Sequence, residues 1–166
     1  MLVRVRASSV NGFDVSVANG RLKGMIEHRF PVVLGRDFAG TVEAAGPGVQ
    51  SPRPGDIVFG VVTKTTLGDG AFGEYVTAPV AYTAWVPAGL DLAVAGALGL
   101  ADTVALAAVD AVAPLPGQTV LISGATVDYT GDVPAAVTAL RPAGIHAVVH
   151  LAGDRTTSWS RPAQPT

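Results

Sequence analysis

Residues 31–48 read PVVLGRDFAGTVEAAGPG, and this stretch decides how the first half of the chain is interpreted. It holds two runs rich in valine and aromatic residues, Val32–Leu34 and Phe38–Ala44, and ends in the sequence Gly46-Pro47-Gly48. Short runs of this composition that end at glycine and proline are typical of β-strands joined by turns. The stretch therefore predicts two strands of a β-rich domain.

The same pattern extends on both sides of this stretch. Four more runs have strand composition: Val3–Arg6, Asp56–Val62, Glu74–Ala78 and Ala84–Val86. Turn-forming sequences at 51–56 and at Gly68-Asp69-Gly70 separate them. Strands at this spacing favour a small barrel or a sandwich, so residues 1–87 are predicted to form one β-rich domain.

The pattern changes after Pro87, where helices are expected. Asp91 can cap an apolar helix that reaches about Leu98, and Asp102 or Thr103 can cap a second helix. Pro114 ends the second helix, because the residue before a proline is disfavoured in helical geometry.

A strand–helix–strand unit follows these helices. The apolar runs Thr119–Ser123 and Ile145–Ala152 have the composition of buried parallel strands. Between them a helix is predicted to begin at Asp132, with one apolar stripe made of Val133, Ala136, Val137 and Leu140. This order predicts a parallel sheet with a right-handed crossover. Residues 154–166 are polar and aperiodic, and we expect a disordered tail.

Composition excludes several kinds of chemistry. The 166 residues carry 11 basic and 13 acidic side chains, a net charge of −2 without a basic run, so a nucleic-acid partner is not expected. The absence of cysteine excludes disulfides, thiolate zinc ligands and cysteine nucleophiles. Residues 92–113 are long enough to span a membrane, but they contain Asp102 and Asp110, each costing roughly 2.5–3.5 kcal/mol near a bilayer centre. The prediction is a pair of buried helices in a cytoplasmic protein, with no membrane.

Seven segments in register resemble the zinc-independent medium-chain dehydrogenase/reductases of the quinone oxidoreductase group. Ala7–Asp14 contains their Asn-x-x-Asp pattern, and Pro31–Val42 matches Pro-x-x-x-Gly-x-Asp-x-x-Gly-x-Val. The other segments are Gly46–Val49, Pro54–Val58, Gly70–Val76, Leu98–Leu106 and Pro116–Ala125. Gly35-Arg36-Asp37 stands where zinc-using relatives have Gly-His-Glu, so no metal is expected.

The resemblance implies a mixed α and β fold. A GroES-like β-barrel, with its first strands missing, is expected over residues 1–87, and a truncated Rossmann-type segment with a partial parallel sheet over 88–153. The implied cofactor is NADPH, and the implied substrate is a small apolar quinone or enone that accepts hydride. Asn11 and Asp14 are the implied catalytic pair. The implied cofactor-binding residues are Asn11, Thr103, Ser123, Gly124 and Ala125.

The resemblance breaks at the expected phosphate site. In the family, glycines after the first Rossmann strand let backbone N–H groups approach the cofactor diphosphate. Here Gly124-Ala125 is followed by Thr126-Val127-Asp128-Tyr129, without a G-x-G-x-x-G pattern. Asp128 would repel a phosphate by roughly 4 kcal/mol at ~4 Å and an effective dielectric near 20. Tight NADPH binding by this chain alone is therefore not expected, although Thr119–Ser123 and Ile145–Leu151 can still pair as neighbours.

Each candidate residue also has a purely structural interpretation. Asn11 and Asp14 could form an Asx-turn with Gly12, and Thr103 could be an N-cap. Asp37 is expected to brace the barrel and Asp56 to belong to a turn. Structural roles are likewise expected for the three histidines, which are His28, His146 and His150.

Three functions remain open at this point. The first is an NADPH-dependent reductase without zinc. The second is a catalytically silent GroES-like module that binds a partner or a small apolar ligand. The third is a fragment or internally shortened product of a longer reductase. Because a short parallel sheet has bare edges, a homodimer that pairs through them is also possible.

Overall fold

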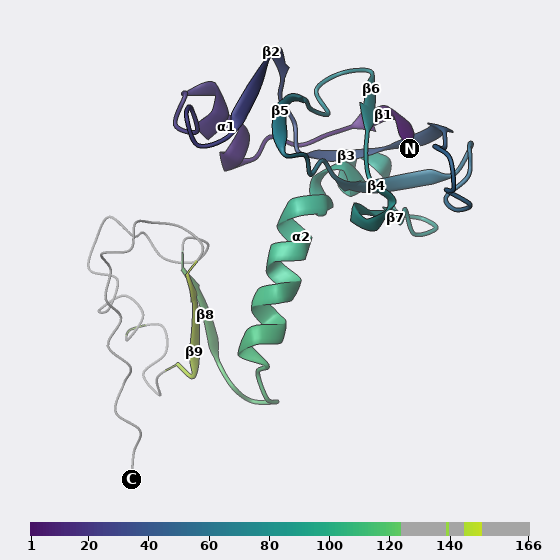
Figure 1. The fold of residues 1–166 in the computed structure, drawn as a ribbon. Coiled ribbons are helices and arrows are strands. Elements are labelled where there is room, and N and C mark those ends of the chain that lie inside the picture. Colours follow the sequence, from purple (N-terminus) through teal and green to yellow (C-terminus); the bar gives the residue numbers. More distant parts are fainter. Residues whose placement is uncertain (124–138, 140–144, 151–166) are drawn as a thin grey trace. The chain divides into compact units, whose positions relative to one another are not determined.

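The computed structural model describes residues 1–123, 139 and 145–150 (Figure 1). The chain divides into two compact units, Met1–Ala105 and Leu106–Thr166. The first unit extends past residue 87, where the composition changes, because it includes the first half of a long helix.

A five-stranded antiparallel sheet forms the centre of the first unit. Its strand order is β6-β1-β3-β4-β7. The bounds are β1 Leu2–Ala7, β3 Asp37–Ala44, β4 Ile57–Val61, β6 Tyr75–Thr77 and β7 Thr83–Trp85. Val3 pairs with Val42 across β1 and β3, and Phe38 pairs with Gly60 across β3 and β4. The strands predicted in these five places are confirmed.

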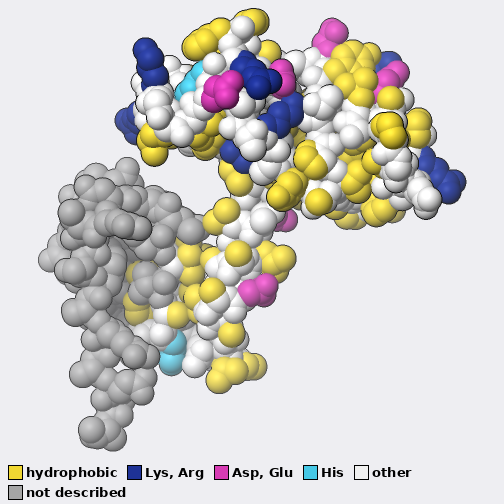
Figure 2. Space-filling model, in the orientation of Figure 1, with side chains coloured by type: hydrophobic (Ala, Val, Ile, Leu, Met, Phe, Trp, Pro, Cys, Tyr) yellow, Lys and Arg dark blue, Asp and Glu magenta, His cyan; other side chains and the backbone are white. Residues whose placement is uncertain are grey.

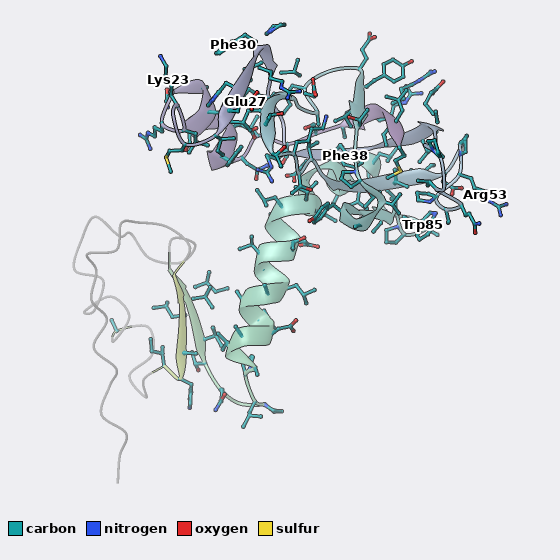
Figure 3. The ribbon with its side chains drawn as sticks, viewed as in Figure 1. Lys23, Glu27, Phe30, Phe38, Arg53 and Trp85 are labelled. Carbon is teal, nitrogen blue, oxygen red and sulfur yellow. The ribbon has the colours of Figure 1, made fainter. Side chains whose placement is uncertain are left out.

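The core of this unit is built by alternate residues of the sheet. Val3, Phe38 and Val58 are completely buried, and Phe38 is the largest of them (Figure 3). The full cluster comprises Val3, Phe38, Val42, Val58, Val62, Ala71, Val76 and Ala78. Most of its members are valines, whose branched side chains fit a pleated surface.

Three elements of the first unit differ from the sequence-based prediction. Strands β2 (Glu27–Val33) and β5 (Thr66–Asp69) form a parallel pair. β2 begins earlier than the strand predicted at Val32–Leu34, and β5 overlaps the turn predicted at Gly68-Asp69-Gly70. Helix α1 (Gly12–Ala18) was not predicted. A seven-residue helix and a four-residue strand are too short to show clear periodicity, so long-range contacts decide them. A 3-10 turn, η1 (Val80–Tyr82), precedes β7.

The prediction of two short helices after Pro87 is wrong, because the structure has one helix, α2, over Leu92–Val112. Asp91 caps its start as predicted, and its Oδ1 accepts the N–H of Ala93 at 2.7 Å. Gly96 and Gly99 do not break the helix. They are packing positions, since a Cβ at Gly99 would lie 2.5 Å from the carbonyl oxygen of Gly60.

Much of α2 is exposed, which also corrects the expectation of a buried helical pair. In the part of the chain that the structure describes, only Ala95, Gly96 and Gly99 of this helix are buried. Hydrophobic side chains occupy its exposed surface (Figure 2), among them Leu106 and Val109. The helix is long and apolar enough to cross a membrane by length and composition, a test that core helices of other proteins also pass.

The second unit contains the parallel pair β8 (Val120–Ser123) and β9 (Ala147–His150). The pairing runs from Val120 opposite Ala147 to Ser123 opposite His150, so both predicted strands and their pairing are confirmed. The helix predicted from Asp132, its crossover and the tail at 154–166 lie outside the described residues.

The packing of α2 gives the first prediction. Gly99→Ala should lower the free energy of unfolding by about 1–2 kcal/mol, because overpacking costs about 1–3 kcal/mol while the better helix propensity of alanine returns up to about 1 kcal/mol. Gly12→Ala is the matched control, since Gly12 is helical and a Cβ there meets nothing within 4 Å. Urea unfolding followed by Trp85 fluorescence measures both. Equal stabilisation by the two substitutions would contradict close packing at Gly99.

Candidate functional site

A cluster of polar side chains lies where β1 ends, α1 begins and β3 begins. The loop Ser8–Asn11 follows β1, and Asn11 is the N-cap of α1. Asp37 is the first residue of β3. The antiparallel pairing of β1 and β3, with Ala7 opposite Ala39, brings the loop and Asp37 together.

Asp37 is the centre of this cluster and is completely buried. Its Oδ2 accepts hydrogen bonds from Ser9 Oγ at 2.6 Å and from Asn11 Nδ2 at 2.9 Å. Its Oδ1 accepts the backbone N–H of Leu100, in α2, at 2.8 Å. Its backbone carbonyl accepts from Ser8 Oγ at 2.6 Å. The prediction that Asp37 braces the barrel is confirmed.

Asp14 is the second buried carboxylate and is only 3% exposed. Its Oδ2 accepts the N–H of Asn11 and its Oδ1 accepts the N–H of Gly35, both at 2.9 Å. Both oxygens of Asp14 are therefore used by backbone donors. Gly35 has φ +101°, and a Cβ there would lie 2.6 Å from the ring of Phe72. Asp14 thus joins the start of α1 to a turn that only glycine fits.

Asn11 is oriented by both carboxylates. Its side-chain amide donates to Asp37 Oδ2, and its backbone N–H donates to Asp14 Oδ2. Ser9 Oγ lies 3.4 Å from the same Nδ2. The amide therefore faces Asp37 in a fixed orientation. An amide neither gains nor loses a proton near neutral pH, so Asn11 can orient a bound group but cannot act as a general acid or base.

The predicted cofactor residues fall in different parts of the chain. Thr103 lies inside α2, where its Oγ1 donates to the carbonyl of Gly99 at 2.6 Å, so its interpretation as an N-cap is wrong. Ser123 is the last residue of β8 in the second unit. Gly124 and Ala125 lie outside the described residues. The structure brings together Asn11 and Asp14 from the predicted set.

Arg36 is a site residue that the sequence-based reasoning missed. Its guanidinium carbon lies 4.5 Å from the centroid of the Phe13 ring, a cation–π geometry. Its Nε is buried and has no hydrogen-bond partner within the described residues. A signal was present, because Arg36 stands between Gly35 and Asp37, where zinc-using relatives have histidine. Arg36 lines a small cavity together with Phe13 and with Asp14, whose two oxygens are already hydrogen-bonded.

The remaining polar candidates have structural roles. Asp56 Oδ2 accepts the N–H of Arg53 at 2.8 Å, which confirms its place in a turn. His28 Nδ1 donates to the carbonyl of Ile26 at 2.7 Å. His146 Nδ1 accepts the N–H of Thr119 at 3.0 Å. Over residues 1–123, 139 and 145–150, no three histidine or carboxylate side chains form a metal-binding group.

The cluster has the chemistry of an orienting site. Its carboxylates hold backbone and amide donors, and its amide is fixed.

Asp37→Asn tests the central carboxylate. The amide nitrogen cannot accept a hydrogen bond, so either Leu100, which uses Oδ1, or Ser9 and Asn11, which share Oδ2, lose their acceptor. The free energy of unfolding should fall by about 1–3 kcal/mol, and amide exchange at Leu100 should accelerate. The control is Asp69→Asn, whose side chain is 78% exposed and which should change stability by less than about 0.5 kcal/mol. Unchanged exchange at Leu100 would show that Asp37 does not hold α2.

Comparison with known proteins identifies the family to which this chain belongs. The family model described as alcohol dehydrogenase GroES-like domain matches residues 1–88. Phthioceranic/hydroxyphthioceranic acid synthase of Mycobacterium tuberculosis is 40% identical over 143 residues, which are 86% of this chain and 6% of the synthase. Trans-enoyl reductase FMN2 of Fusarium mangiferae is 41% identical over 100 residues, which are 60% of this chain and 24% of that protein.

Solved structures agree with this assignment. The quinone oxidoreductase from Coxiella burnetii has a TM-score of 0.63 at 30% identity, covering 74% of this chain and 39% of its own. Mycobacterial Rv1454c, solved as a complex with NADPH, has a TM-score of 0.60 at 34% identity, covering 74% and 36%. The chain thus spans less than half the length of each of these proteins. The chain belongs to the alcohol dehydrogenase GroES-like domain family, with the fold of the medium-chain dehydrogenase/reductases.

Proposed function

We propose that this chain is the substrate-orienting part of an oxidoreductase that reduces an activated double bond, such as an enone, a quinone or an enoyl thioester, without zinc. The observation that carries the proposal is the Asp37–Asn11–Asp14 network, in which two buried carboxylates fix one amide. The names of the trans-enoyl reductase and of the quinone oxidoreductase support this class of substrate.

Independence from zinc is supported by the donor set. The chain has no cysteine, and the position after Gly35 carries a guanidinium, which cannot ligate a metal. Asp37 stands where zinc-using relatives have glutamate. Both of its carboxylate oxygens accept hydrogen bonds from donors of the chain itself. Polarisation of the substrate therefore falls to hydrogen-bond donors of the protein.

Reduced nicotinamide would supply the hydride, as the NADPH complex of the mycobacterial relative suggests. The residues of this chain do not fit tight binding of its diphosphate. β8 pairs directly with β9, and the sequence after β8 offers Gly124 followed by Thr126-Val127-Asp128 in place of a glycine-rich turn. The part proposed for this chain is therefore the orientation of substrate.

Arg36 is the proposed donor to the substrate. A carbonyl oxygen next to the reduced double bond gains negative charge during reduction, and a fixed cationic donor stabilises such charge. The buried Nε of Arg36 has an unused N–H in the described part of the chain, and the Phe13 ring holds its guanidinium. Asn11 and Asp14 are then positioning residues, because their hydrogen bonds hold the turn at Gly35 and the start of α1.

A catalytically silent binding module is the second candidate. The missing glycine-rich turn favours it, since the orienting site is present without a fitting diphosphate site. Both candidates predict binding of a small carbonyl ligand, and they differ in turnover. A cytoplasmic location and a homodimer through the sheet edges remain predictions.

Binding of an enoyl thioester tests the proposal. Crotonyl-N-acetylcysteamine should bind saturably to the purified chain, and Arg36→Met should weaken binding about 10- to 100-fold, the effect of losing a charged hydrogen bond worth about 1.5–3 kcal/mol. Arg36→Lys should restore part of the loss. Arg53→Met, in an exposed turn, is the matched control. Undiminished binding by Arg36→Met would contradict the proposed role of Arg36.

NADPH titration tests the cofactor assignment separately. Tryptophan fluorescence of the purified chain should show no saturation at micromolar NADPH, because the backbone cradle for the diphosphate is missing. The positive control is mycobacterial Rv1454c, which was solved as a complex with NADPH, under the same conditions. Saturable micromolar binding, with NADPH oxidised in the presence of the crotonyl thioester, would show that the chain itself is a complete reductase.

A further inference from the structure

A large groove lies between α1, the loop that follows it and β2 in the first unit. Its volume is about 730 Å³, within the roughly 300–1,000 Å³ typical of small-molecule sites. The apolar residues that line it include Val17, Met25, Ile26, Phe30, Val32 and Leu34. Figure 3 labels three residues that line the groove, which are Lys23 in the loop after α1 and Glu27 and Phe30 in β2.

Two large apolar side chains of this groove face solvent. Met25 is 76% exposed and Phe30 is 84% exposed. Neither belongs to the core cluster under the five-stranded sheet. Hydrophobic side chains gathered on a concave surface are typical of a binding site, because a ligand that covers them removes apolar surface from water.

The groove adjoins the site built around Asp14 and Arg36. A small cavity of about 30 Å³ is lined by both residues and by Phe13. Val17, Val32 and Leu34 line this small cavity and the groove alike. A molecule whose polar end reaches Arg36 would therefore have its apolar end at the groove.

The charged residues of the groove favour an uncharged ligand. Lys23 and Glu27 have opposite charges, so the charged side chains that line the groove sum to zero, and Glu27 Oε1 pairs with Arg29 Nε at 3.3 Å. His28 Nδ1 already donates to the carbonyl of Ile26, and its ring stacks on Phe30 with 6.3 Å between centroids. The polar residues of the groove thus provide no net charge for an ionic head group.

We propose that this groove binds the uncharged alkyl chain of an acyl thioester substrate, while the thioester carbonyl lies toward Arg36. The inference rests on the proposed function, because that function supplies the thioester. It adds the substrate class: the preferred acyl groups carry an apolar chain beyond the reacting double bond. Met25 and Phe30 are the residues that would select for chain length.

A series of saturated thioesters tests the inference without cofactor or turnover. Calorimetry would measure the binding of butanoyl-, hexanoyl- and octanoyl-N-acetylcysteamine to the full chain. Affinity should rise about fourfold for each added methylene, the equivalent of ~0.8 kcal/mol per buried CH₂. Met25→Gln and Phe30→Ser should flatten this length dependence, because they should weaken octanoyl binding more than butanoyl binding. Because both side chains are largely exposed, their replacement should not unfold the chain.

Tyr82→Ser is the matched control, since Tyr82 is 53% exposed and does not line the groove. This variant should keep the full length dependence. Equal affinity for all three thioesters, or a length dependence that Met25→Gln and Phe30→Ser leave intact, would overturn the inference. The proposed function would then stand if Arg36→Met still weakened crotonyl binding. A length dependence that depends on Phe30, without any effect of Arg36→Met, would support the groove and contradict the proposed function.

Discussion

The buried carboxylate of Asp37 holds the candidate site together. It accepts hydrogen bonds from the loop after β1, from Asn11 at the start of α1 and from the backbone of α2. The loop and the start of α1 are neighbours in the sequence, but Asp37 and Leu100 are 26 or more residues away from them, so one side chain fixes the relative positions of distant segments. A buried charge is costly unless its hydrogen bonds are complete, and here both oxygens are used. This requirement makes the surrounding geometry specific, because losing one donor destabilises the whole arrangement.

Small residues on α2 allow the contact with Asp37. A Cβ at Gly99 would meet the carbonyl of Gly60 and Asp37 Oδ1, and a Cβ at Gly96 would meet Ala7. The helix can therefore approach the sheet closely enough for the N–H of Leu100 to reach the carboxylate. Asp37 also accepts the hydrogen bond that orients the amide of Asn11. The orienting network and the packing of α2 depend on one set of contacts.

Strand composition and turn residues were enough to predict most of the antiparallel sheet, and the pair β8–β9 was also predicted. Asn11 and Asp14 were identified by resemblance, and their proximity is seen in the structure. Helix α1, strand β5 and the unbroken course of α2 were not predicted. The first two are too short for periodicity to show, and the glycines of α2 look like helix breakers until the residues against which they pack are known. Arg36 was missed because its neighbour Phe13 is 23 residues away in sequence.

The amino-acid sequence by itself determined the family, the absence of thiolate ligands and the lack of a glycine-rich turn after β8. These properties depend on residue identity and order, which the sequence states directly. Only the tertiary structure decided that the oxygens of Asp14 and Asp37 accept hydrogen bonds from the chain itself, that Arg36 Nε is buried, and that a groove adjoins the small cavity lined by Arg36 and Asp14. The physical reason is that hydrogen-bond partners, burial and cavities arise from contacts between distant segments, which local patterns do not encode.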